Sequence, residues 1–549
     1  MVILLDRKNG TETRMGLLGK INSFLKFDEV DTRYELLERE KGSPAQLEGW
    51  EDVYPQGVDE AVPIPESIDE VEKTLRQIFR SDINTDVIYR RFNIGKEPAM
   101  LVFMNGMASS DNISRFILAP AMEAEPKEGL TPDYIVNKVI HLSETEQTED
   151  LTKVKLSIMD GMTVLFAGEK PFALLLDTRG YEKRSVSTSE NEKVVRGPQE
   201  GFTESLRTNI TLLRRIIRSD DLVVEYRLGG GDNNTRIAIV YREGIANRTL
   251  ISEVKRRLSK INVRMLLSTG VIEQLIEDST WSPLPQVLST ERPDRVSSYV
   301  MNGGAVVIAD GSPFAIVMPI TISTLMSTPE DIYTRQPLGT VMRVVRYAGA
   351  ILSLMLPAYF IALALYHQGL LSTEVLSTVI QSRKMVFEPL PFEMLLLLFV
   401  FQLIREAGMR VPGSIGQAIG VIGGLILGQA AVAANLASSV ILIIVALSGL
   451  GNFCIPDYST QIAASYFRIA FVIAAWMGGL LGLVAAFMLF VGYAANLKSF
   501  GVPFLSPFAP KTYSKRPMVI RGKIKMHHRA EDYINAFSDT LEKRRDGLE

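Results

Sequence analysis

The sequence predicts a soluble α/β region made of two related subdomains, followed by an all-α domain that crosses a membrane several times. Long apolar runs are nearly all confined to residues 346–497, whereas charged residues are spread through the first part of the chain. A membrane-spanning helix needs about 20 mostly apolar residues, and only the second part supplies such runs repeatedly. Within the first part, two patterns of strands recur about 140 residues apart, which indicates an internal repeat.

The repeat consists of two strand-pair patterns. DVIYRRFNIGKEPAMLVFMNGMASSDNI at residues 86–113 is matched by LVVEYRLGGGDNNTRIAIVYREGIANRTLI at residues 222–251. MDGMTVLFAGEKPFALLLDT at residues 159–178 is matched by MNGGAVVIADGSPFAIVMPI at residues 301–320. Each pattern joins two strands through a glycine-bearing turn, because glycine adopts positive φ at low cost. We therefore expect five parts in order: a charged arm, two α/β subdomains, a helical membrane domain and a basic cytoplasmic tail, at residues 1–60, 61–190, 191–335, 336–500 and 501–549.

A motif and an arginine-rich helix connect the two subdomains. The motif RGPQEGF comprises Arg196, Gly197, Pro198, Glu200, Gly201 and Phe202, and its Gly-Pro pair breaks the chain before the helix. Apolar residues recur at helical spacing from Leu206 to Ile217. The other sides of this helix carry Arg207, Arg214, Arg215 and Arg218. These arginines fit a site for phosphate or acidic ligands, but a solvated face or a strip of salt bridges between subdomains is the more common arrangement.

Signals of catalysis and of metal binding are weak. The glycine-rich GGGDNN at residues 229–234 lacks the Lys-Ser/Thr of a phosphate loop. One cysteine, Cys454, and four histidines, scattered apart from the final pair His527 and His528, argue against a disulfide framework or a zinc site. We therefore expect a binding protein without enzymatic activity, with no cofactor, no metal and no nucleic-acid partner.

Five apolar stretches form the predicted membrane domain. Four can span a bilayer, at residues 346–367, 411–436, 437–456 and 468–497. The fifth has an uninterrupted apolar core of only eight residues, so residues 390–407 are expected to form a short re-entrant or interfacial helix. Basic residues before the first and after the last span place both ends in the cytoplasm, which requires an even number of crossings. A five-span arrangement, with the basic tail outside, is the alternative.

One predicted span, residues 411–436, is rich in glycine and presents a mildly polar face. That face carries Gln417, Val421, Gly424, Gly428, Ala431 and Asn435. It fits either a tight packing seam or the lining of a pore. The ionisable residues Glu393, Arg405 and Glu406 favour the pore, because charged groups at membrane depth usually face a bundle interior or water. We expect Arg405 and Glu406 to form a salt bridge or a hydrogen-bonded pair near its start.

Four motifs resemble the A subunit of GerA-type spore germination receptors. They are RGPQEGFTESLRTNI at residues 196–210, PLPFEMLLLLFVFQLIREAGMRVPGSIGQAIGVIGGLILGQAAV at 389–432, IPDYS at 455–459 and KSFGVPFLSPFAP at 498–510. The resemblance covers roughly residues 60–510. It implies a multi-pass protein of the spore inner membrane that assembles with a polytopic nutrient-binding B subunit and a C-subunit lipoprotein. It further implies that A subunits form a homo-oligomeric ring, embedded in membrane lipid, that acts as a nutrient-gated cation channel.

Three other functions remain open from the sequence. The same family contains a SpoVAF-type paralogue, for which the resemblance implies an accessory role that amplifies ion release. A secondary transporter could use Glu393 or Glu406 to take up protons, although such proteins often repeat their membrane halves and here the repeat is soluble. A structural scaffold without conduction would need only the soluble repeat.

Overall fold

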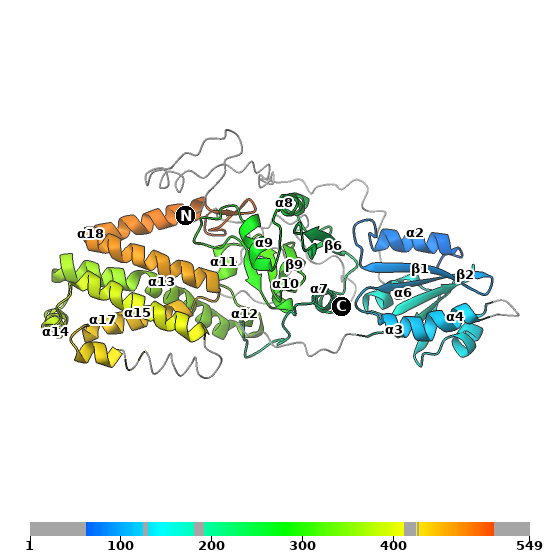
Figure 1. The fold of residues 1–549 in the computed structure, drawn as a ribbon, viewed down its shortest axis with the longest axis horizontal. Coiled ribbons are helices and arrows are strands. Elements are labelled where there is room, and N and C mark those ends of the chain that lie inside the picture. Colours follow the sequence, from blue (N-terminus) through cyan, green and yellow to red (C-terminus); the bar gives the residue numbers. More distant parts are fainter. Residues whose placement is uncertain are drawn as a thin grey trace, which may run out of the picture.

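The computed structural model describes residues 62–124, 130–180, 192–410, 424, 426 and 428–509. Two sheet-containing subdomains and a bundle of long helices follow one another along the molecule (Figure 1). The expected N-terminal arm, at residues 1–60, and residues 510–549 of the expected tail lie outside the described part. The two α/β subdomains and the helical region after them agree with the predicted fold class.

The first subdomain is a five-stranded antiparallel sheet with the strand order β1-β2-β4-β5-β3. Helices cover both of its faces, so alternate residues of β2 enter different cores: Met100 and Val102 face α2 and α6, whereas Leu101 and Phe103 face α3, η1 and α4. Burial on both faces explains why this strand is a continuous apolar run. The elements are α2 (Ile68–Ile78), β1 (Val87–Ile94), β2 (Glu97–Met104), α3 (Ser110–Ile113), η1 (Ser114–Leu118), α4 (Ala119–Glu123), α5 (Pro132–Tyr134), η2 (Ile135–Val139), β3 (Thr145–Thr148), α6 (Leu151–Met159), β4 (Thr163–Ala167) and β5 (Ala173–Leu176).

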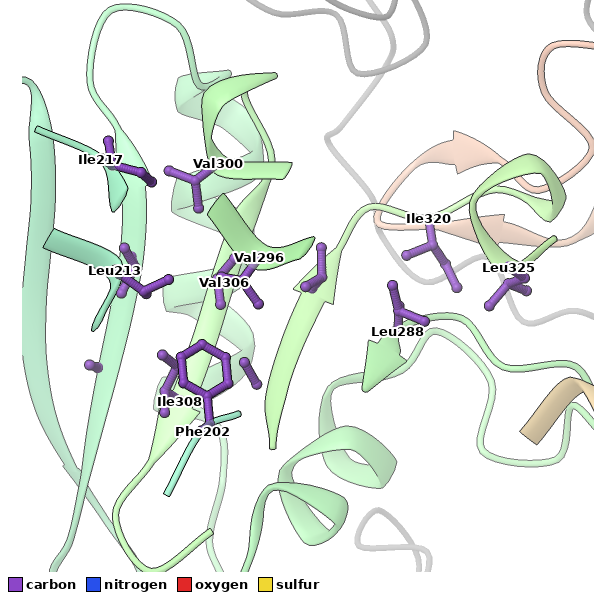
Figure 2. Packing of buried hydrophobic residues seen from close by; sticks show 14 of the residues in the cluster. Phe202, Leu213, Ile217, Leu288, Val296, Val300, Val306, Ile308, Ile320 and Leu325 are labelled. Atoms are coloured by element: carbon purple, nitrogen blue, oxygen red, sulfur yellow. The ribbon is translucent and has the colours of Figure 1, made fainter. Parts of the chain in front are cut away.

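The second subdomain repeats this plan. Its strand order, β6-β7-β9-β10-β8, places the strands in the same sequence of positions as in the first sheet. Figure 2 shows one of its two cores, where Leu213 of α7 and Val296 of α10 pack against Val306 and Ile308 of β9. The elements are α7 (Leu206–Ile216), β6 (Leu222–Gly229), β7 (Thr235–Arg242), α8 (Arg248–Ser259), α9 (Thr269–Ile276), β8 (Leu288–Thr290), α10 (Pro293–Met301), β9 (Ala305–Ala309), β10 (Ala315–Met318), α11 (Ile322–Leu325) and α12 (Glu330–Tyr333).

A helical bundle follows. Among the described residues, two helices, α13 and α18, are long and apolar enough to cross a membrane by length and composition, and α17 is a shorter apolar helix. The elements are α13 (Gln336–Tyr366), η3 (Gln368–Leu370), α14 (Thr373–Arg383), α15 (Leu390–Arg410), α17 (Ser439–Phe453), α18 (Tyr458–Asn496), β11 (Lys498–Ser499) and β12 (Val502–Pro503). The second subdomain lies against one end of the bundle, called here the subdomain end, and the opposite end is called the distal end (Figure 1).

Helix α18 differs from the single span expected at residues 468–497, because it folds back on itself. Gly479 has φ 55° and ψ −139°, a conformation open to glycine and outside the helical region. The rings of Phe467 and Phe490 lie 4.7 Å apart, although a straight helix would separate these residues by about 35 Å. Residues 458–478 and 480–496 therefore form two antiparallel limbs whose turn lies beside Tyr366, at the distal end (Figure 1).

Helix α15 is longer than the short re-entrant helix expected at residues 390–407. Its 21 residues extend over about 31 Å. It begins at the distal end, where Glu393 contacts Ser438 at the start of α17, and reaches the subdomain end, where Arg405 contacts Gln461 of α18. The expected helix was too short because the polar and charged residues were taken to end its apolar core. In the structure, residues of the bundle bind Glu393 and Arg405, so the helix continues past them.

Candidate functional site: the junction between the second subdomain and the bundle

Helix α12 joins the soluble region to the first long helix through a buried carboxylate. Asp331 is 3% exposed and accepts hydrogen bonds from Arg343 Nε at 3.0 Å and from Arg346 Nη1 and Nη2 at 3.0 and 3.1 Å. Arg346 also donates to the backbone oxygen of Met326 at 2.7 Å. Burial by itself would raise the pKa of Asp331, but hydrogen bonding to Arg346 and the charges of both arginines outweigh it and hold this pKa below its usual value. The start of α13 is thereby fixed to the second subdomain.

The motif between the subdomains also reaches α12. The guanidinium of Arg292, which is 1% exposed, binds the Asp294 carboxylate at 2.8 and 3.1 Å and the backbone oxygen of Pro198 at 2.9 Å. Tyr333 of α12 donates its hydroxyl to the same carboxylate at 2.9 Å. Gly197 has φ 128°, and a Cβ added there would lie 2.7 Å from the Tyr333 ring. Only glycine therefore fits between the linker and the helix that precedes α13.

The other motif residues serve the second subdomain itself. Phe202 is buried in the core that Figure 2 shows, and its backbone N–H donates to the backbone oxygen of Glu291 at 2.7 Å. Glu200 accepts from Arg215 at 3.2 Å, while Gly201 is buried and Arg196 is exposed. The structure thus brings this candidate set together as a packing and linking segment.

The chain after the last helix returns to the second subdomain and forms its other link with the bundle. The backbone N–H of Phe500 donates to Asp278 Oδ2 at 2.9 Å, and the guanidinium of Arg257 lies 4.2 Å from the Phe500 ring centre. Ser499 donates to the backbone oxygen of Gln286 at 2.6 Å. The same Ser499 hydroxyl accepts from the backbone N–H of Ile320 at 3.0 Å. Residues 498–504 of the KSFGVPF motif are therefore docked in the soluble region.

The second limb of α18 packs against the same surface. Ala494 and Leu497 belong to the core cluster that also contains Leu325. The Tyr493 hydroxyl donates to Ser282 Oγ at 2.8 Å. The second subdomain is thus fastened both to the helix that opens the bundle and to the helix that closes it.

Ion pairs between the two subdomains hold two of the four arginines expected on this helix, Arg214 of α7 and Arg218 just beyond it. Arg214, 3% exposed, pairs with the buried Asp86 of the first subdomain at 3.1 Å. Arg218 pairs with Asp160 at 3.2 Å, and Lys155 with Asp220 at 2.7 Å. Burial raises the pKa of Asp86 despite the lowering effect of the Arg214 charge. These contacts correspond to the salt-bridge strip, the more common of the two arrangements that the sequence allowed.

The three ionisable residues of α15 have separate partners. Glu393, fully buried, pairs with Arg383 at 3.1 Å and accepts the backbone N–H of Ser438, so its carboxylate caps the N-terminus of α17. Arg405 donates to Gln461 Oε1 at 2.6 Å. Glu406 pairs instead with Arg410, one helical turn away, at 2.7 Å. The structure therefore does not contain the expected Arg405–Glu406 salt bridge.

The expected pore face is described only in part. Gln417 and Val421 lie outside the described residues. A Cβ at Gly424 would meet nothing within 4 Å, whereas one at Gly428 would lie 3.3 Å from Leu442 of α17. Ala431 packs against the bundle core, and Asn435 has φ 56° in the turn before α17. Gly428 and Ala431 thus pack against the rest of the bundle. Of the two described glycines on this face, only the exposed Gly424 has room for a larger side chain.

Sequence reasoning missed the junction. Its key side chains are Arg257, Asp278, Arg292, Asp294, Asp331 and Tyr333. Only the helix-start pattern ERPDR at residues 291–295 carried a local signal, since Pro and Asp are favoured in the first turn. Within the described residues, no group of three or more His, Cys, Asp or Glu could hold a metal ion.

Comparisons with known proteins agree with the sequence motifs. A family model described as "Bacillus/Clostridium GerA spore germination protein" matches residues 73–533. "Spore germination protein KA" of Bacillus subtilis is 34% identical over 431 residues, which cover 78% of this chain and 79% of that protein. The "Uncharacterized membrane protein YfkQ" of the same organism is 33% identical over 432 residues, covering 78% of this chain and 83% of that protein.

The chain is also similar to a solved structure. It is the crystal structure of the N-terminal domain of the A subunit of the Bacillus megaterium spore germinant receptor GerK3, with 24% sequence identity and a TM-score of 0.35. The match covers 47% of this chain and 96% of that domain. The family assignment rests on the sequence matches, which extend across the soluble region and the bundle: this chain belongs to the GerA family of spore germination proteins.

Proposed function

We propose that this chain is the A subunit of a nutrient-responsive spore germination receptor and forms an oligomeric, nutrient-gated cation channel in the spore inner membrane. The observation that carries the proposal is the double attachment of the second subdomain. Asp331 ties it to the start of α13, and Phe500 ties it to the segment that follows α18. A movement of this subdomain would therefore be passed to the first and last helices of the bundle together.

The path of the chain supports a membrane domain with an even number of crossings. Helices α13, α15 and α17 and both limbs of α18 run between the subdomain end and the distal end. The span that the sequence predicts at residues 411–436 would add a sixth crossing, since α15 ends at the subdomain end and α17 starts at the distal end. Six crossings would keep both chain ends on the cytoplasmic side, as the basic residues favour. We therefore propose six crossings in place of four; α17, at about 22 Å, would need local thinning of the bilayer.

The proposed partners follow from the family. The similarity to spore germination proteins such as KA of Bacillus subtilis supports assembly with other receptor subunits, and we propose a polytopic nutrient-binding B subunit and a C-subunit lipoprotein. We also propose a homo-oligomeric ring in the membrane lipid. Enzymatic activity is not part of this proposal.

A secondary transporter is less well supported than a channel. A transporter would need a carboxylate that is free to exchange protons. Glu393 is fully buried and already bound by Arg383 and by the backbone of Ser438, and Glu406 is paired with Arg410. The SpoVAF-type accessory role remains the second candidate, because it shares the family and would use the same junction.

Ion conductance tests the channel directly. The purified chain would be reconstituted in lipid vesicles and its potassium conductance compared with that of Gly424→Leu, where the new side chain has open space on its own chain. Gly492→Leu is the matched control, since this glycine of α18 also has nothing within 4 Å of an added Cβ. We expect Gly424→Leu to reduce the conductance at least several-fold and Gly492→Leu to leave it unchanged. Equal currents in all three proteins would remove the pore assignment.

Spores then separate the receptor from the accessory role. A strain that lacks this chain should fail to release ions in response to its nutrient if the chain is a receptor subunit. Release that still begins on time but proceeds slowly would favour the accessory role. Normal release would contradict both.

A further inference from the structure

A buried polar network lies at the subdomain end of the bundle and connects four helices. Arg468 of α18, 2% exposed, donates to Ser448 Oγ of α17 at 3.1 Å, and Ser448 donates to the backbone oxygen of Ser353 in α13 at 2.9 Å. Arg468 also lies 3.4 Å from Ser465 Oγ, one turn from the Gln461 side chain that binds Arg405 of α15. Two guanidinium groups are thus held inside an apolar bundle by neutral partners.

Neither guanidinium has a carboxylate within salt-bridge distance in the part of the chain that the structure describes. The nearest carboxylate in sequence, Glu406, is bound to Arg410. Two buried positive charges without a counter-charge are costly, because each loses its hydration. A third component with negative charge would remove this cost.

The unused hydrogen-bonding atoms indicate the sign of that component. Among the described residues of the network and of α15 beside it, three buried donors have no hydrogen-bond partner: Arg405 Nη1, Arg468 Nε and Asn452 Nδ2. The same residues leave one buried acceptor, Gln402 Oε1, without a partner. These atoms belong to four side chains of α15, α17 and α18, and Asn452 is joined to the network through Ser353 at 3.3 Å. A surplus of donors around two cations matches an anion. Guanidinium forks match the planar oxygens of an oxyanion better than they match a spherical ion.

We propose that Arg405 and Arg468, together with Asn452, form a binding site for a small oxyanion of the carboxylate type. The site would lie next to the second subdomain, because Ala463 and Phe467, on the same turns of α18, pack in or against the core of that subdomain. A bound carboxylate would link α15, α17 and α18 at the place where the second subdomain is attached. The proposal is independent of ion conduction.

The test uses acetate and the purified full-length chain in detergent. The midpoint of thermal unfolding is measured while potassium chloride is replaced by potassium acetate at constant ionic strength. Ligand binding to the folded state raises the midpoint in a saturable manner, by roughly 2 °C for modest affinity. Wild type and Arg264→Gln should both show this rise, since Arg264 is an exposed arginine of the second subdomain that pairs with Asp232.

Removing the site should abolish the saturable rise. Arg405→Gln and Arg468→Gln should retain only the gradual change that acetate causes in any protein. If a glutamine variant does not fold, Arg468→Lys keeps the charge without the fork and should shift half-saturation to roughly tenfold higher acetate. The same response in all variants, or no saturable response in wild type and Arg264→Gln, would overturn the proposal. So would a midpoint that depends on protein concentration and not on acetate, because an acidic side chain of a second copy would then be the counter-charge.

Discussion

Asp331→Asn should loosen the attachment of α13 to the second subdomain. The change removes the negative charge that Arg343 and Arg346 share, while nearly preserving size and shape. Asp331 is 3% exposed, but the two arginine side chains are 19% and 11% exposed, so part of their charge remains hydrated. Breaking a fully buried ion pair costs about 3–5 kcal/mol, and this partial exposure reduces the expected loss to about 2–4 kcal/mol.

Thermal unfolding of the detergent-solubilised chain measures this loss. For a unit of 150–250 residues, 1 kcal/mol corresponds to about 2–4 °C, so we expect the loss of about 2–4 kcal/mol to lower the midpoint by about 4–16 °C. Asp232→Asn is the matched control, because the Asp232–Arg264 pair is exposed and should contribute about 0–1 kcal/mol. A midpoint within ~1 °C of wild type for Asp331→Asn would refute the view that this carboxylate fastens the helix.

The same variant predicts a pH dependence. Since the folded-state pKa of Asp331 lies below its unfolded value, its contribution is present above pH ~4 and is lost as the pH falls through the folded pKa. The difference in unfolding midpoint between wild type and Asp331→Asn should therefore be constant from pH ~7 to ~5 and shrink below pH ~4. A difference that grew on acidification would contradict the assigned direction.

Further substitutions test the other contacts by the same unfolding measurement. Gly197→Ala should destabilise the chain by about 1–3 kcal/mol, and more than Gly311→Ala, which also has positive φ but open space; equal losses would exclude the steric contact with α12. Phe500→Ala should cost about 3–5 kcal/mol and increase hydrogen exchange in β11 and β12, and unchanged exchange would argue against docking by this ring. Glu393→Gln should cost about 3–5 kcal/mol, and Glu406→Gln, in an exposed pair, less than about 1; the reverse order would contradict the observed partners.

The internal repeat was readable from sequence because its signals are local. The turns at Gly95 and Gly168 need positive φ, which favours glycine. The apolar strands on either side of such turns can therefore be recognised in the sequence, and their recurrence reveals the repeat. The shared strand order of the two sheets was not readable, because the pairing of β4 with β2 and of β3 with β5 joins segments far apart in the chain. The boundary between soluble and helical regions followed from composition alone.

The course of the last helix needed the tertiary structure. Gly478 and Gly479 resemble the small residues found inside many membrane helices, and the apolar residues next to them do not predict a turn. The packing of Phe467 and Phe471 against Phe490 holds the two limbs together, and this contact exists only after the chain has folded back. A continuous apolar sequence is equally compatible with one long helix or with two shorter antiparallel ones.

The sequence by itself thus determined the fold class, the repeat and the family, since these depend on periodicity, turn residues and long motifs. The tertiary structure decided which charges meet. Arg405 and Glu406 are neighbours in sequence and have different partners, because successive residues of a helix point in directions about 100° apart. Asp278 and Phe500 are separated by more than two hundred residues and contact each other, because β11 and β12 fold back onto the second subdomain. Contacts of this kind depend on the path of the whole chain, and they form the junction on which the proposed function rests.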